Sequence, residues 1–223
     1  GVEINVSADV LRIKDFTWNV NANVSYNKNE ITELYNGITE YVASDTGRMV
    51  AVGHPLGEFY LNRYAGVNPT NGDALWYTKD GEITTEYNES DKVMLGKTHE
   101  APWQGGFGTT LSWQGFSLSA QFTWVADRWM LNNDRVFQES NGLFSAYNQS
   151  KRMLYDRWKK PGDVTDIPRY GVTPQLDSRF LEDASFLRLK NLMLSYTFPQ
   201  KWLQRTNFLS SARIYAQGQN LLT

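Results

Sequence analysis

The segment at residues 107–125, FGTTLSWQGFSLSAQFTWV, most constrains what this chain can fold into. Apolar and polar side chains alternate along it on both sides of a Gln114-Gly115 break. Such alternation is typical of strands with two unlike faces, and a two-residue break containing glycine joins such strands into a hairpin. One face is apolar and aromatic, whereas the other carries Ser, Thr and Gln without charge. A membrane β-barrel needs this combination, with lipid outside and water inside.

Residues 16–26 repeat the pattern, with aromatic and aliphatic residues at the even positions. The opposite face carries Asn19, Asn21 and Asn23. Three amides on one strand face do not suit a packed core, because each buried amide needs several hydrogen-bond partners. They favour a water-filled lumen. The alternative is the exposed face of a soluble β-sandwich.

Composition narrows the class of protein. The net charge of −2 across 223 residues gives no nucleic-acid footprint, so we expect no nucleic-acid partner. The chain has no cysteine, which excludes disulfides and thiolate metal sites. No apolar run approaches the roughly 20 residues of a transmembrane helix.

The pattern predicts eight strands whose connections are alternately short and long, as in outer-membrane barrels with short periplasmic turns and long external loops. The predicted strands cover residues 2–13, 16–26, 57–67, 74–78, 103–113, 116–125, 186–198 and 209–222. A change of parity is expected near Asp9-Val10. Arg188 and Lys190 would face lipid, so either they lie at the membrane rim or a bulge near Asn191 shifts the parity. A helix is expected at residues 145–158.

The chain begins and ends within apparent strands, which we interpret as the sign of a piece of a longer protein, because a domain rarely leaves sheet edges unpaired.

Several sequence blocks resemble the SusC/RagA family of TonB-linked outer-membrane transporters. They run in order along essentially the whole chain. The blocks are GHPLGEFY at 53–60, YAGVNP at 64–69, NGD at 71–73, GGFGTTLS at 105–112, GFSLS at 115–119, RFLEDASFLRLKN at 179–191, LSY at 194–196 and GQNLLT at 218–223.

The resemblance implies an all-β fold: a transmembrane antiparallel β-barrel segment, about eight strands of a 22-stranded barrel, with long extracellular loops. Residues 1–223 would be the C-terminal part of that barrel, without the plug domain and the final strand. The location would be the outer membrane of a Gram-negative, Bacteroidetes-type cell. The function would be TonB-dependent import of oligosaccharides or peptides. The partners would be a SusD-like surface lipoprotein, outer-membrane lipid and, through regions absent here, TonB.

Two other functions remain as alternatives. One is a soluble β-sandwich module that binds carbohydrate. The other is a TonB-dependent receptor for siderophores or cobalamin, which would share the barrel but lack the SusD-like lid.

The residues do not indicate an enzyme or a metal site. His54 and His99 lie in separate loops, and no nucleophile–base pair or metal-ligand spacing is present. Asn71-Gly72-Asp73 lacks the spaced oxygen ligands that calcium requires. We therefore expect no catalytic residue, no metal and no cofactor.

Ligand binding would use exposed aromatic rings and amides, because Trp offers a flat surface for stacking and Asn both donates and accepts hydrogen bonds. The longest predicted external loop, at residues 127–179, carries such residues. The candidates are Trp129, Asn132, Asn133, Trp158 and Tyr170. Alternatively, these side chains pack the loop onto the barrel or onto the lid.

Overall fold

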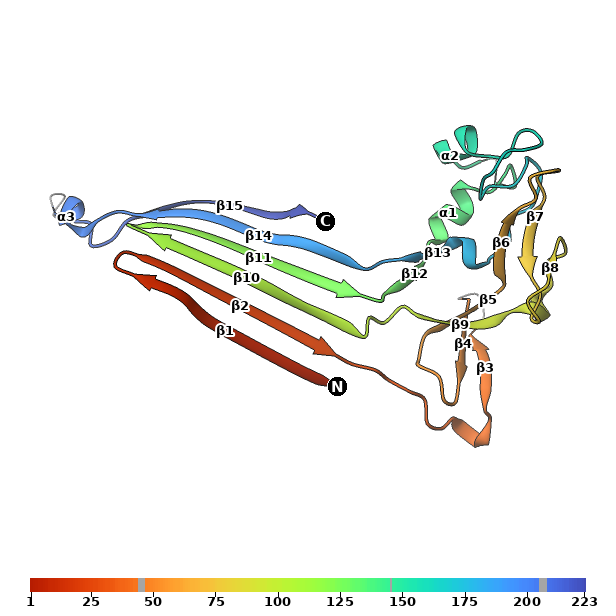
Figure 1. Ribbon diagram of the computed structural model, residues 1–223, viewed down its shortest axis with the longest axis horizontal. Helices are drawn as coiled ribbons and strands as arrows, with labels where there is room; N and C mark the ends of the chain where they lie inside the picture. Colours follow the sequence, from red (N-terminus) through yellow and green to blue (C-terminus); the bar gives the residue numbers. More distant parts are fainter. Residues whose placement is uncertain (44–46, 145, 205–207) are drawn as a thin grey trace. The chain divides into compact units, whose positions relative to one another are not determined.

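Six long antiparallel strands form the principal sheet in the computed structural model, which describes residues 1–43, 47–144, 146–204 and 208–223 (Figure 1). The strands lie in the order β1-β2-β10-β11-β14-β15. Their bounds are β1 Val2–Ile13, β2 Phe16–Tyr26, β10 Trp103–Trp113, β11 Phe116–Ala126, β14 Phe186–Thr197 and β15 Arg213–Leu222. Together with short flanking segments they form one of two compact units of the chain, here called the sheet unit (residues 1–28, 101–127 and 185–223).

The register of the strands places apolar residues opposite apolar residues over most of the sheet. Phe107, for example, lies opposite Ala22 on one side and Phe122 on the other. Since side chains alternate between the two faces of a strand, this register gives the sheet one continuous apolar face and one polar face. All six strands are described, and their apolar face carries no charged residue.

Two bulges maintain this separation of faces. The β1–β2 register shifts between Asp9 and Leu11, which confirms the expected change of parity. The β11–β14 register shifts between Gln121 and Phe122, so that Asn191 pairs with Gln121 and Leu189 pairs with Phe122. The extra residue is Lys190. The bulge therefore turns Arg188 to the polar face, and the alternative of a bulge near Asn191 is correct.

Tight turns lie at one end of the sheet, here called the turn end. Lys14 and Gln114 each have a positive φ, of 47° and 46°, and Gly115 follows Gln114 with φ 89°. Positive φ at both central residues, as in Gln114-Gly115, is a geometry that joins two right-twisted strands through two residues. The long segments start at the opposite end, here called the loop end. Short and long connections thus alternate in the sheet as expected.

Two of the eight predicted strands do not join the principal sheet. Residues 57–67 divide into β5 (Glu58–Leu61) and β6 (Arg63–Val67), which belong to different small sheets. Residues 74–78 form β7 (Ala74–Tyr77), which pairs with β6 through a tight turn. These segments belong to the second compact unit, here called the loop unit (residues 29–100 and 128–184).

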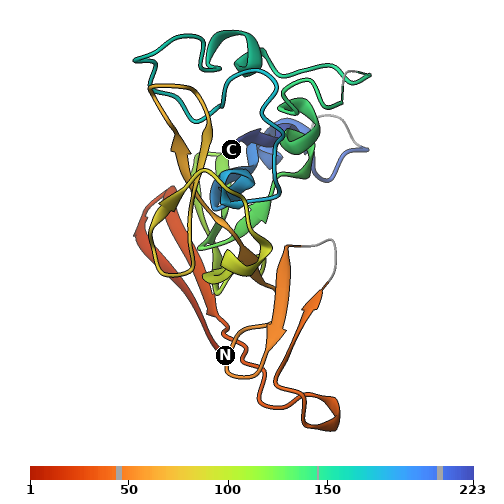
Figure 2. The same cartoon turned by 90° about the vertical axis from the view of Figure 1, so that its right-hand side faces the viewer.

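The loop unit contains three small sheets and a few short helices (Figure 2). The sheets are β3-β4-β5-β9, β6-β7-β8 and β12-β13. The remaining strand bounds are β3 Glu40–Ala43, β4 Arg48–Ala51, β8 Ile83–Thr84, β9 Val93–Thr98, β12 Trp129–Leu131 and β13 Leu181–Asp183. Its apolar core is a cluster of Phe59, Leu61 and Leu181.

The helices differ from the expectation for residues 145–158. Only α2 (Lys151–Tyr155) forms there, and Ser145 lies outside the described residues. A second short helix, α1 (Asn133–Gln138), was not predicted. Both are too short to show a clear helical period in the sequence, and each begins at a polar N-cap, Asn132 or Ser150. A further short helix, α3 (Gln200–Leu203), lies in the turn before β15.

Candidate functional site

The polar face of the principal sheet is the candidate functional site. Side chains bond across neighbouring strands along it: the Thr110 and Ser119 hydroxyls lie 3.3 Å apart, and Gln217 donates to Asn191 over 2.7 Å. These pairs leave further donors and acceptors open toward solvent. The face is therefore a hydrogen-bonding wall of mainly neutral groups, as predicted for a water-filled lumen.

Glycines create hollows in this wall. A Cβ at Gly108 would meet the Gln121 side chain, which lies over this position. A hollow next to it, here called the amide hollow, is lined by residues from β1, β2, β10, β11 and β14. Its polar side chains are Asn5, Ser7, Asn21, Asn23, Gln121, Thr123 and Lys190. The sequence signals for this site were the strand-face asparagines and the irregular alternation around Lys190.

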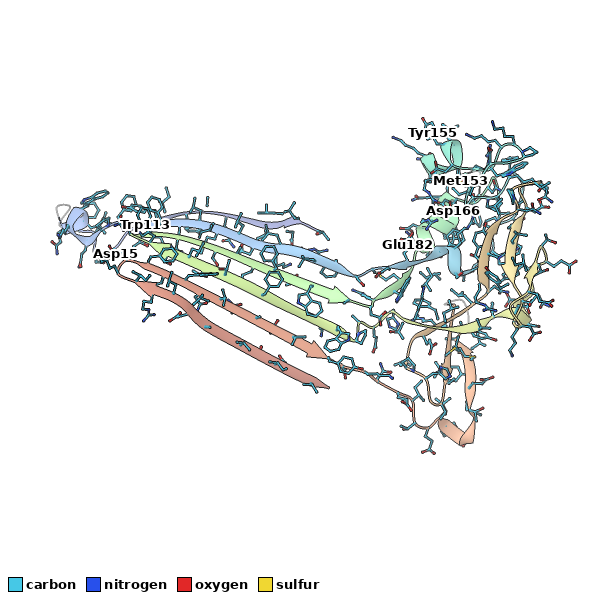
Figure 3. The ribbon with its side chains drawn as sticks, in the orientation of Figure 1. Asp15, Trp113, Met153, Tyr155, Asp166 and Glu182 are labelled. Carbon is cyan, nitrogen blue, oxygen red and sulfur yellow. The ribbon has the colours of Figure 1, made fainter. Side chains whose placement is uncertain are left out.

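The apolar face carries aromatic pairs at both ends. Tyr26 and Trp103 have ring centroids 4.4 Å apart at the loop end, and Phe116 and Tyr196 have centroids 4.5 Å apart at the turn end. Asp15 and Trp113 also lie at the turn end (Figure 3). Aromatic residues at both ends of the strands are typical of the two lipid–water boundaries of an outer-membrane sheet. A further stacked pair, Phe107 and Phe122, with centroids 4.8 Å apart, lies between the two ends.

Two polar groups on the apolar face hydrogen-bond to each other. The Trp18 indole N–H donates to the Thr109 hydroxyl over 2.9 Å. An unpaired N–H is costly in a hydrocarbon environment. Thr109 therefore supplies the acceptor that lipid cannot.

The predicted ligand-binding residues do not form one cluster. Trp129 packs against the core cluster of the loop unit, and the Lys97 ammonium lies 3.4 Å from its ring centroid. Asn132 caps α1 by accepting from the Arg135 N–H over 3.1 Å, and it donates to Glu182 over 3.0 Å. Trp129 and Asn132 therefore both make contacts inside the loop unit.

The other three candidates lie in different settings. Asn133 is exposed at the start of α1. Trp158 donates to the Pro69 carbonyl over 3.1 Å, and its ring covers Gly72, where a Cβ would collide with it. Tyr170 is 66% exposed, with the Arg157 guanidinium 5.4 Å from its ring centroid. Ligand binding by these residues stays a prediction.

A buried carboxylate lies at the centre of a charged network in the loop unit. Glu139, 1% exposed, accepts hydrogen bonds from Arg135 and, over 2.7 Å, from Arg152. The two arginines continue to Glu182 and Asp166, both labelled in Figure 3. The hydrogen bonds that Asn132 and Arg135 donate to Glu182 lower its pKa. This network ties α1, α2 and β13 together.

A second buried carboxylate, Asp177, joins the two segments of the loop unit. It accepts from the Trp76 indole N–H over 2.8 Å and from the Arg179 main-chain N–H over 2.9 Å. Burial raises the pKa of Asp177, although the Trp76 hydrogen bond and the charge of Arg179 oppose the increase. Because the folded state holds this proton more firmly, the loop unit should lose stability as the pH rises from the ordinary aspartate range through the raised pKa.

Replacing Asp177 by Ala should lower the free energy of unfolding of the loop unit by about 2–5 kcal/mol, because two buried N–H donors would lose their acceptor. The measurement is hydrogen exchange on the full-length protein in detergent, followed at residues 60–80 and 175–185. The control is Asp163→Ala, which removes an exposed carboxylate that accepts only from the main chain of Lys159 and Lys160. Equal protection in both variants would contradict the prediction.

The histidines and the calcium-like loop form local contacts. His54 Nδ1 lies 2.9 Å from a Glu58 carboxylate oxygen, and the ring of His99 lies over Gly57. Asp73 pairs with Arg169 over 2.9 Å. Within the described part of the chain, no three His, Cys, Asp or Glu side chains are grouped to hold a metal ion.

No helix among the described residues is both long enough and apolar enough to cross a membrane.

Curated relatives match the full length of this chain. It is 27% identical over 246 aligned residues to TonB-dependent receptor P3 of Formosa agariphila, covering 100% of this chain and 24% of that protein. It is 25% identical to TonB-dependent receptor SusC of Bacteroides thetaiotaomicron, covering 99% of this chain and 22% of that protein. No family model matches. The chain thus spans about a quarter of the length of these relatives.

Solved structures agree with the sequence matches. A structure of the RagAB peptide transporter superposes with a TM-score of 0.92 at 36% identity, covering 99% of this chain and 25% of that chain. The RagAB peptide importer in its "open-open" state gives a TM-score of 0.89. The all-β fold predicted from alternation is therefore confirmed, as is the resemblance of this chain to the SusC/RagA family of TonB-linked outer-membrane transporters.

Proposed function

We propose that this chain is part of the barrel wall of a TonB-dependent importer in the outer membrane. The imported molecules are oligosaccharides or peptides, and a SusD-like surface lipoprotein is the partner. The two-faced sheet carries this proposal: its apolar face is uncharged and its opposite face is a polar wall. The likeness to SusC and to the RagAB peptide transporter supports the same function.

Residues 1–223 form the C-terminal part of that barrel in this proposal. The two edge strands, β1 and β15, each pair on one side only. Unpaired main-chain groups are not tolerated in hydrocarbon, so further strands of the whole protein must close the barrel. The plug domain, the final strand and the contact with TonB belong to regions outside this chain.

The soluble carbohydrate-binding sandwich has less support. A sandwich needs two sheets whose apolar faces bury each other. The described residues of the sheet unit form a single sheet, whose apolar face exposes side chains such as Phe107, Leu118 and Leu194. The relatives likewise favour neither this alternative nor a siderophore receptor. We propose no catalytic role, because the relatives are named as receptors and transporters.

The test is extraction of the native outer membrane in mild detergent through a tag on this chain. We expect a chain several times longer than 223 residues, a surface lipoprotein in a one-to-one ratio, and substrate uptake that stops when the proton-motive force is collapsed. A chain that is soluble without detergent and has no partner would overturn the proposal.

A further inference from the structure

Three cations lie on the polar face of the last two strands, and we call them the basic stripe: Arg188, Lys190 and Arg213. Arg188 lies opposite Thr123 of the polar face, and Lys190 borders the amide hollow. Arg213 donates to Ser195 over 2.8 Å. The bulge at Lys190 brings the first two cations to this face, because unbroken alternation would have turned both toward lipid.

The basic stripe has neutral partners. Arg188 donates to the Thr223 hydroxyl over 2.9 Å, and Lys190 donates to the side-chain amide oxygen of Asn220 over 3.1 Å. Within the described residues, no ion pair joins the basic stripe to a carboxylate. A cation that keeps only neutral partners retains most of its attraction for an external anion.

The distribution of acids reinforces this charge. The polar face has Asp or Glu only on β1, at Glu3 and Asp9, while β2, β10, β11, β14 and β15 provide none. Asp9 is already paired with Arg12 over 3.1 Å. β1 also lies at the edge of the sheet opposite β15. Among the described residues, the β14–β15 side of the wall is therefore positive, with no carboxylate on either strand.

The amide hollow lies beside Lys190. Its side-chain amides come from Asn5, Asn21, Asn23 and Gln121, and no carboxylate lines it. Glycine at position 106 leaves room there, because a Cβ would come within 2.9 Å of the Phe122 carbonyl. Amide N–H groups and an ammonium are donors that match the several lone pairs of a carboxylate.

We infer that the amide hollow, together with Lys190 and Arg188 of the basic stripe, forms a subsite for the carboxylate of a transported ligand. The inference deepens the proposed transport function and rests on it. Lys190 supplies the charge, and Gln121 on the neighbouring strand β11 supplies the nearest amide donor. Asn21 and Asn23 lie on β2, two strands beyond β11, and extend the hydrogen-bonding floor of the hollow. Arg188, opposite Thr123, adds attraction from the loop end. An acidic peptide or a uronic-acid oligosaccharide carries the required group.

The test uses the full-length transporter with its lipoprotein, purified in detergent, and four probes in titration calorimetry. Two peptides of equal length, one of Gly-Asp repeats and one of Gly-Asn repeats, differ only in charge. Oligogalacturonate and oligogalactose of equal length form the sugar pair. The preferred acidic probe identifies the source of the carboxylate.

Lys190→Gln should weaken binding of the preferred acidic probe about tenfold, the value of one charged hydrogen bond, and leave the neutral probe unchanged. Lys190→Arg should restore acidic binding, because the charge is retained. Lys201→Gln, an exposed lysine in α3, should have no effect. Raising the ionic strength should reduce the difference in affinity between the acidic and the neutral probe for the wild-type protein.

Equal loss for acidic and neutral probes would overturn the subsite, as would a wild type that prefers neither acidic probe. Two other experiments test the proposed transport function: co-purification of the partner and energy-dependent uptake. A transporter that imports neutral probes and ignores acidic ones would refute the subsite and leave that function intact.

Discussion

Ala120→Arg should prevent the full-length protein from assembling in the outer membrane. Ala120 lies on the apolar face of β11, between Thr109 of β10 and Leu192 of β14. A charged arginine on the lipid face near the bilayer midplane costs about 2–4 kcal/mol. Because alanine is small, the substitution removes almost no packing, and the cost comes from the charge. The measurement is the fraction of chains that show the heat-dependent gel mobility of a folded barrel.

The neighbouring residue provides the matched control. Ser119 lies on the polar face, opposite Thr110 and Met193. Ser119→Arg adds the same side chain one residue away and should assemble normally, because the charge stays in water. Ala120→Leu should also assemble, since it enlarges an apolar contact with lipid. If both arginine variants assembled equally well, the assignment of the two faces would be wrong.

Glu139→Ala should produce the largest loss of order in the loop unit. Glu139 is buried and accepts from both Arg135 and Arg152. Removing one partner from a buried ionic network costs about 3–5 kcal/mol. Here the two arginines would lose the buried acceptor that they share and would keep only the more exposed Glu182 and Asp166. We expect faster hydrogen exchange and faster proteolysis across residues 128–184, while the sheet unit keeps its heat-dependent mobility.

Glu89→Ala is the control for this change. Glu89 pairs with Lys92 three residues away, and its side chain is 72% exposed. A surface pair of this kind contributes at most about 1 kcal/mol, so protection should barely change. Glu139→Gln keeps the volume and one acceptor, and it should give an intermediate loss. A Glu139→Ala protein as resistant to protease as Glu89→Ala would show that the network does not hold the loop unit together.

The principal sheet was largely predictable from sequence, because the alternation of neighbouring residues along each strand indicates it. A strand with lipid on one side and water on the other must alternate, and residues 16–26 and 107–125 do so along their full length. The change of parity at Asp9-Val10 was equally visible, because a bulge shifts the pattern by one residue.

The small sheets of the loop unit were not predictable in the same way. Residues 57–67 alternate like a spanning strand, yet Asn62 divides them into two strands. β5 pairs with β9, whose residues lie more than 30 positions later, whereas β6 pairs with β7 through a nearby turn. Local alternation indicates a strand, but only distant partners decide which sheet it joins.

For the candidate ligand residues, too, distant parts of the chain decide what each side chain contacts. Trp129 and Trp158 were selected because rings and amides in external loops can bind ligands. The structure places Trp129 against an apolar cluster and Trp158 over Gly72, contacts that depend on residues far away in sequence. A sequence shows which side chains can bind, but not which of them are already occupied.

The sequence by itself thus determined that this chain forms two-faced membrane strands, because lipid and water impose opposite requirements on alternate residues. The tertiary structure decided which way Lys190 faces, because a register shift across β11 and β14 sets the direction of its side chain. It also decided that asparagines from β1 and β2 share one hollow with Gln121 of β11, since only the sheet register brings these strands side by side.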